Sequence, residues 1–262
     1  MCLIKILEIF EEVCYTCGNL KIMEAFMNYN YHSSTMDDVV FNFIYGCALV
    51  DAITQKSFDG KKDWIGKEVP EARETVKTYI TQVLSGTFEQ ECDASRAKHE
   101  AAFLEAAITL CKQINDKGKA LGQKGTFHFG NAQKLINMTV KHVYAHTYSM
   151  QAVTGKSMRE KFRYCHCPMD QEMLKKVWEA YENTDRRETL GHGNKYNGKH
   201  EAGFCKPWGN EDFALDEQEK PALPMRYLRF QKGITDHIAA QNGDIFPIEY
   251  DYLEWKPDFR KQ

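Results

Sequence analysis

The sequence lacks any long apolar run. No stretch of about 18 apolar residues occurs in its 262 residues, so nothing in it predicts a membrane-spanning helix. Residues 1–13 are amphipathic and acidic, and they lack the basic start and small-residue cleavage site of a secretory signal. We therefore expect a soluble, cytoplasmic protein that makes no membrane contact.

Glycine loops of the Walker and dinucleotide-binding types are also missing, as are internal repeats and strand-rich blocks. The nine cysteines are an odd number spread over the whole chain, which is poor material for a disulfide framework and favours a reducing compartment. The pairs Cys14 with Cys17 and Cys165 with Cys167 lack the second knuckle-like pair that a structural zinc site usually needs. We expect no metal and no cofactor.

Charge is distributed unevenly along the chain. Residues 112–166 contain ten lysines and arginines but two acidic residues, a local charge of +8, whereas the whole chain carries −3, so the remainder carries −11. A basic middle between acidic flanks suits a polyanion-binding face on a body that otherwise repels polyanions. A solvated helical surface would give the same count, and charge alone does not decide between the two.

Apolar residues recur at helical spacing almost throughout, and at 43% they are numerous enough to fill a sizeable core. The sequence therefore predicts an all-α fold. Core stripes are expected in residues 3–13, 39–50, 70–83, 135–144 and 227–240, with Ser95 or Asp93 capping a further helix that reaches Ile114. An aromatic segment, residues 248–255, is expected to pack back on the core.

Two loops stand out from this helical pattern. Residues 118–133 contain four glycines in a basic setting and predict a tight turn that enters a helix near Leu135. Residues 159–168 end in a proline-stiffened turn and lead to Asp170, an expected helix N-cap. Residues 183–224 are rich in Gly, Pro and charge, which predicts a long loop that is either disordered or functional.

Lys134 and Asp170 are the residues best suited to chemistry. A glycine-led hairpin before a helix presents backbone N–H groups to phosphate, and the helix N-terminus adds a favourable partial charge. A desolvated lysine beside such a hairpin can attack an electrophilic sugar carbon, and a nearby carboxylate can stabilise positive charge there. The simpler interpretations are a solvated lysine and an ordinary N-cap, and the residues alone leave both open.

These two motifs together resemble the helix-hairpin-helix DNA glycosylases. Gly130 and Lys134 match the first glycine and the lysine of that family's hairpin, and Pro168-Met169-Asp170 resembles its P-h-D turn. The likeness is strongest to the archaeal 8-oxoguanine DNA glycosylase branch and to related bacterial anti-phage glycosylases. It covers residues 118–182. Ala132 departs from the family pattern, because many members have a second glycine there.

The resemblance implies a protein that flips a modified base out of double-stranded DNA and excises it, in repair or in anti-phage defence. Some members of the family also have an abasic-site lyase activity. It implies two helical lobes around a cleft within one domain, residues 1–262: a hairpin and catalytic lobe near residues 66–182, and a second lobe from residues 1–65 with 183–262. Lys134 and Asp170 would be catalytic. The expected DNA-binding residues are Lys124, His128, Gly130, Asn131, Ala132, Gln133 and Lys141. No obligate protein partner is implied.

Three other functions remain as alternatives. A metal-dependent nuclease would place metal-binding carboxylates in a cleft. The spacing of Arg187 and His192 matches one class of helical ribonuclease, although it lies in the glycine-rich loop. A helical nucleic-acid-binding or assembly module would have no catalytic activity.

Overall fold

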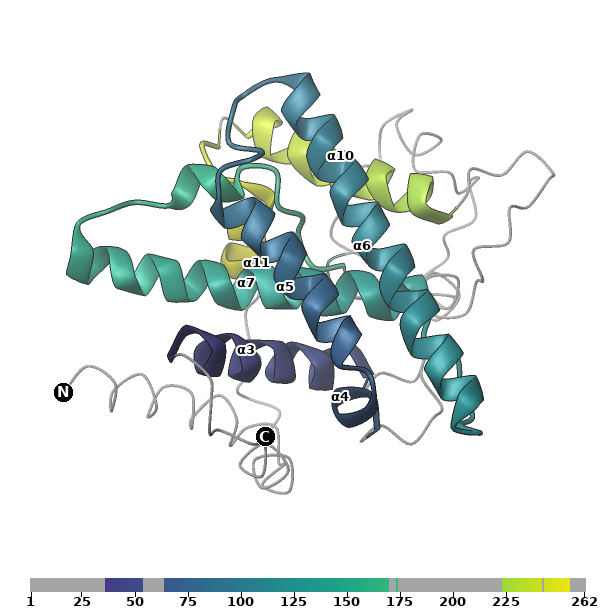
Figure 1. Ribbon diagram of the computed structural model, residues 1–262. Coiled ribbons are helices and arrows are strands. Elements are labelled where there is room, and N and C mark those ends of the chain that lie inside the picture. Colours follow the sequence, from purple (N-terminus) through teal and green to yellow (C-terminus); the bar gives the residue numbers. More distant parts are fainter. Residues whose placement is uncertain (1–35, 54–63, 170–172, 174–222, 242, 255–262) are drawn as a thin grey trace, which may run out of the picture. The chain divides into compact units, whose positions relative to one another are not determined.

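The computed structural model describes residues 36–53, 64–169, 173, 223–241 and 243–254 (Figure 1). Helices make up 78% of this described part, which contains no strand, so the predicted all-α class is confirmed. The elements are α3 (Met36–Ile53), α4 (Trp64–Glu68), α5 (Pro70–Leu84), α6 (Asp93–Ala120), α7 (Phe129–Thr154), η1 (Arg159–Phe162), α10 (Leu223–Ala240) and α11 (Pro247–Glu254).

The chain forms two compact units, Met1–Gly46 and Cys47–Gln262. The boundary falls inside α3. In the first unit the described residues form the N-terminal part of this helix, where the rings of Phe41 and Tyr45 stack with centroids 6.3 Å apart. The predicted pair of lobes around a cleft has other boundaries and stays a prediction. Everything described below lies in the second unit.

Most of the predicted helices are present, with differences at their ends. Pro70 occupies the first turn of α5, as expected, because its missing N–H costs nothing there. The N-cap of α6 is neither Asp93 nor Ser95. Cys92 takes this position, and its sulfur accepts a hydrogen bond from the Ser95 N–H. Ser95 therefore contributes to the cap as the donor.

The face of α3 that is buried differs from the predicted stripe. Cys47 and Val50 are partly exposed, whereas Ala48, Leu49, Ala52 and Ile53 are buried. The prediction failed because this helix is apolar on nearly every side, so that its sequence does not select one face.

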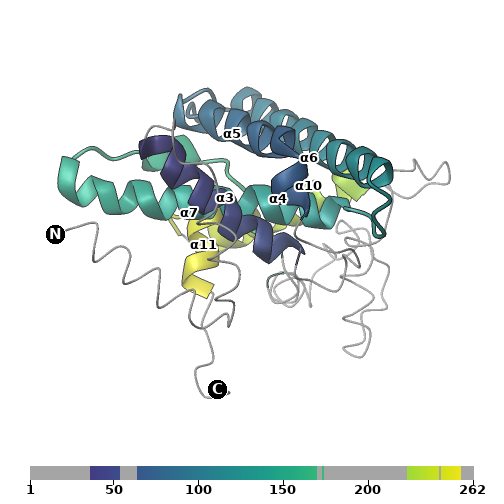
Figure 2. The same ribbon diagram turned by 60° about the horizontal axis from the view of Figure 1, so that its bottom comes forward.

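Helix α6 packs against both α5 and α7, and α10 packs against α11 (Figures 1 and 2). The first four turns of α7 are nearly enclosed. Between Asn131 and Tyr144 the residues are buried except Lys134, Met138 and His142, which are partly exposed. These three lie four residues apart and form one narrow stripe along the helix, the open stripe of α7.

The predicted packing of the last aromatic segment is confirmed for one face of α11. Ile248 is fully buried and Tyr250 is nearly so, whereas Tyr252 and Leu253 are exposed. Residues 1–35, 174–222 and 255–262 lie outside the described part, so the predictions for the first helix, for the helix after Asp170 and for the glycine-rich loop are not examined by the structure.

Candidate active site around Lys134

An exposed turn, residues 121–128, joins α6 to α7. Gly122 and Gly125 have positive φ angles of 64° and 102°, a conformation that favours glycine. Asn115 fixes the far end of the turn, because its side chain accepts a hydrogen bond from the Phe127 N–H at 2.7 Å and donates one to the Phe127 carbonyl at 3.0 Å. Lys124 is exposed at the tip, where a phosphate could reach it.

Helix α7 begins at Phe129, six residues before the predicted start near Leu135, so Gly130 lies in its first turn and not in the turn that precedes it. Asn131 explains this early start. Its side-chain oxygen accepts the His128 N–H at 3.0 Å, and its side-chain nitrogen donates to the Ala52 carbonyl on α3 at 2.8 Å. The first bond satisfies a backbone donor at the helix end, and the second anchors this end to α3.

Three of the predicted DNA-binding side chains point into the protein. Asn131, Ala132 and Gln133 are 1%, 0% and 2% exposed. Because the helix starts early, these side chains face the core, and the expected contact of residues 130–133 with the DNA backbone stays a prediction. Gly130 and His128 are partly exposed and remain compatible with a backbone contact.

Lys141 is also engaged inside the protein. It is 9% exposed, forms an ion pair with Asp251 on α11, and lies 4.6 Å from the ring centroid of Tyr252. The Tyr252 hydroxyl donates to the Lys141 carbonyl at 2.7 Å. The charge of Lys141 is therefore paired within the protein, and its expected contact with DNA stays a prediction.

Lys134 occupies the open stripe of α7, so its amine belongs to a largely enclosed helix and still reaches an accessible surface. Asp51 on α3 interacts electrostatically with both Lys134 and Lys141. Burial raises the pKa of the Asp51 carboxyl, and the two lysines partly oppose that rise. The surroundings of Lys134 thus include a carboxyl group that the sequence pattern did not indicate.

The segment before Asp170 is tied to the residue before Lys134. Gln133 donates to the Met169 carbonyl at 2.9 Å and accepts from the Met169 N–H at 3.3 Å. Gln133 also donates to the Gly130 carbonyl at 3.1 Å and accepts from Asn137 at 3.1 Å. Its side-chain amide therefore makes all four of the hydrogen bonds it can form. Asp170 itself lies outside the described residues.

Helix α10 holds the same segment from two further points. Gln231 accepts from the Cys167 N–H at 3.1 Å and donates to the Cys167 carbonyl at 2.7 Å. The Tyr227 hydroxyl lies 2.8 Å from the Asn137 side-chain nitrogen and 2.9 Å from Nδ1 of His166. The amide nitrogen of Asn137 can only donate, so the Tyr227 hydroxyl accepts from Asn137 and shares its second hydrogen bond with His166.

A buried aromatic and histidine cluster lies behind this segment. Nε2 of His99 on α6 lies 2.7 Å from the Tyr79 hydroxyl, and the rings of His99 and His166 are 5.0 Å apart. Burial lowers the pKa of His99 to about 3. Burial, together with the neighbouring His99, holds the pKa of His166 well below its usual range. Both rings are neutral at physiological pH.

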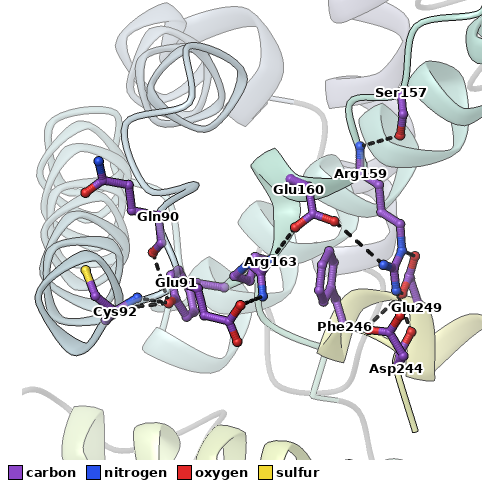
Figure 3. Close-up of polar contacts among 11 residues, drawn as sticks. Gln90, Glu91, Cys92, Ser157, Arg159, Glu160, Arg163, Asp244, Phe246 and Glu249 are labelled. Atoms are coloured by element: carbon purple, nitrogen blue, oxygen red, sulfur yellow. Dashed lines mark hydrogen bonds and ion pairs between the residues drawn. The ribbon is translucent and has the colours of Figure 1, made fainter.

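Residues before the segment are anchored to α11 (Figure 3). Arg159 in η1 binds Glu249 through Nε at 2.7 Å and Nη2 at 2.8 Å, while its guanidinium carbon lies 4.1 Å from the Phe246 ring centroid. Arg163, one turn later, contacts Glu91 at 2.8 Å. These arginines, both within the basic middle of the sequence, stabilise the fold and are not free to bind a polyanion together.

Among the described residues, a groove between α5 and α6 is lined by acidic side chains and by no lysine or arginine. Its lining includes the carboxylates Glu71, Glu74 and Glu105. Phosphate would be repelled there. The acidic flanks of the sequence thus include a surface distinct from the exposed turn that carries Lys124.

The described residues contain no group of three or more His, Cys, Asp or Glu side chains that could hold a metal ion. None of the described helices is long and apolar enough to cross a membrane. Comparison with known proteins gave no match to any family model, curated protein or solved structure.

The sequence pattern did not indicate four residues of this site: Asp51, Asn137, Tyr227 and Gln231. Each is a polar residue within an apolar helical stripe, and that is the signal that could have indicated them. A buried polar side chain is costly unless it is paired, so its presence in a stripe points to a specific partner.

Proposed function

We propose that the protein is a DNA glycosylase that excises a modified base through Lys134 and Asp170. The observation that supports this most directly is the pair of hydrogen bonds between Gln133 and Met169. Lys134 follows Gln133, and Asp170 follows Met169. The bonded pair ties the residue that precedes Lys134 to the residue that precedes Asp170, although the two lie far apart in sequence.

The surroundings of Lys134 suit a nucleophile. Its place on the open stripe of α7 gives a flipped nucleotide access to an amine on an otherwise enclosed helix. The exposed turn at residues 121–128, with Lys124 at its tip, enters the same helix and offers a contact for the DNA backbone. This turn takes the place of the hairpin that the sequence suggested nearer to Gly130.

In the proposed reaction the amine of Lys134 attacks C1′ of the flipped nucleotide. The bond between C1′ and the base breaks, its electron pair leaves with the base, and the base takes up a proton from water. Asp170 accepts the proton that the attacking nitrogen releases. The sugar ring then opens: the bond between C1′ and O4′ breaks, O4′ takes the proton from Asp170, and a protonated Schiff base joins Lys134 to C1′. Strand cleavage can follow from it as a lyase step.

Borohydride trapping on duplex DNA with an abasic site tests this proposal. The wild type is expected to form a covalent adduct, Lys134→Gln to form none, and Asp170→Asn to form it far more slowly. Lys112→Gln is the control, because this exposed lysine lies on α6 away from the site. Activity should persist in EDTA, which separates a glycosylase from a metal-dependent nuclease.

The opposite results are also informative. If the wild type forms no adduct and releases no base from modified phage DNA, the glycosylase proposal is wrong. DNA binding that persists under those conditions and weakens with salt would then favour a binding module.

A further inference from the structure

Residues 165–169 are held mainly by side chains from two helices. The Cys165 N–H donates to the Phe162 carbonyl within the turn after η1. Beyond it, the N–H and carbonyl of Cys167 bond to Gln231, and those of Met169 bond to Gln133. Each glutamine therefore replaces the backbone partner that a neighbouring strand would supply to an extended chain.

A buried chain of side chains also links Gln133 to His166. The Asn137 side-chain nitrogen donates to both Gln133 and the Tyr227 hydroxyl, and that hydroxyl shares a hydrogen bond with Nδ1 of His166. Tyr227 lies one turn before Gln231 on α10. The Tyr227 ring stacks on Phe103 with centroids 5.2 Å apart and planes at 7°. Its hydroxyl is thereby fixed between α7 and residues 165–169.

We propose that Gln231 and Tyr227 on α10 are positioning residues for Lys134 and Asp170. They hold residues 165–169, which precede Asp170 in the sequence, against the helix that carries Lys134. Neither residue needs to touch DNA for this role. The inference depends on the proposed glycosylase reaction, and it adds that the reaction requires α10, which comes far later in the chain.

Loss of either residue should slow the chemical step more than it weakens DNA binding. Misplacement of a reacting group by 1 Å can cost about 10²-fold in rate. We therefore expect the single-turnover rate of borohydride-trapped adduct formation to fall about tenfold or more in Gln231→Leu and in Tyr227→Phe. The dissociation constant for abasic-site DNA should change by less than about threefold, because the DNA-facing turn at residues 121–128 is intact.

Tyr227→Phe is the sharper variant, because it removes one hydroxyl and leaves the stacked ring in place. Ile234→Val is the matched control: Ile234 is fully buried on the same helix, so its truncation tests a general loss of packing. The control should keep the wild-type rate at a temperature where all variants are folded. If Tyr227→Phe and Gln231→Leu also keep that rate while the wild type forms the adduct, the positioning role is refuted and the glycosylase proposal stands. If the wild type forms no adduct, the glycosylase proposal fails, and the catalytic role of these residues fails with it.

A second measurement tests the holding of residues 165–169 without any enzyme assay. Cys167 is 0% exposed. Its labelling by a thiol reagent, followed by mass spectrometry of the Cys167 peptide, should be about tenfold faster or more in Gln231→Leu than in Ile234→Val. Equal labelling in the two variants would show that Gln231 does not hold this segment, whatever the reaction at Lys134.

Discussion

Acid should destabilise this protein well above the pH at which its carboxylates titrate, because two neutral histidines are buried in its core. His99 and His166 are 1% and 5% exposed. The pKa of His99 is about 3 in the folded protein, against 6.5 for the ordinary side chain, and that of His166 is held well below its usual range. The unfolded chain therefore takes up these protons first, and stability is lost as the pH falls through 6.5.

The size of the effect follows from this difference. Between pH 7 and pH 5 the unfolded state gains about 2 kcal/mol per histidine by protonation, whereas a ring of pKa about 3 gains almost nothing in the folded state. His99 should therefore cost about 2 kcal/mol, and His166, whose pKa is also held well below its usual range, adds to the loss. His142, whose pKa burial lowers to about 4, adds to the loss in the same direction. A loss of this size is a large part of the 5–15 kcal/mol, roughly, that stabilises a domain.

Urea unfolding followed by circular dichroism at pH 7, 6 and 5 measures this loss. His99→Phe should lower the stability at pH 7, because it leaves the Tyr79 hydroxyl without the His99 ring as its partner. It should also reduce the pH dependence by the part that His99 supplies, about 2 kcal/mol between pH 7 and pH 5. Phe103→Leu, a core truncation without a titratable group, should displace the whole curve in parallel. A wild-type free energy that stays constant from pH 7 to pH 5, or an unchanged slope in His99→Phe, would refute the assignment of neutral buried rings.

Other perturbations should separate structural residues from DNA-binding ones. Lys141→Met should cost about 3–5 kcal/mol in urea unfolding because it removes the ion pair with the buried Asp251 carboxylate, and the double variant with Asp251→Leu should recover most of this loss. Asn131→Ala should lower the free energy of unfolding by about 1–3 kcal/mol, because it removes two hydrogen bonds at the start of α7. An unchanged free energy of unfolding would refute that anchoring role. Asp51→Asn should keep or raise stability at pH 7, because the raised pKa of this carboxyl means that its charge is unfavourable in the folded state; a clear loss would contradict this. Lys124→Gln should reduce the salt dependence of DNA binding by about one unit of slope without changing the thermal midpoint, and an unchanged slope would exclude its contact with phosphate.

Local pattern determined the helices of the described part and the general position of the turn before α7. The helical spacing of apolar residues in α5, α7 and α10 recurs over many turns, and each such helix needs only its own sequence to be recognised. Pro70 marked the start of α5 for the same reason, since a proline fits the first turn of a helix wherever that helix packs. The exact start of α7 was not visible, because the side chain that fixes it, Asn131, bonds to Ala52 on α3.

Tertiary structure alone decided which polar residues are inside and what they hold. Lys141 and Lys134 are both lysines in the basic middle of the chain, but Asp251 pairs with the first, while the second lies on the open stripe of α7. Gln133 and Gln231 are ordinary glutamines until the fold places the Met169 and Cys167 backbones against them. A hydrogen bond between residues far apart in sequence depends on the packing of whole helices. The local spacing of apolar residues therefore does not predict it. The sequence by itself thus pointed to Lys134 and Asp170, and the packing of α7 and α10 determined the buried amides beside them.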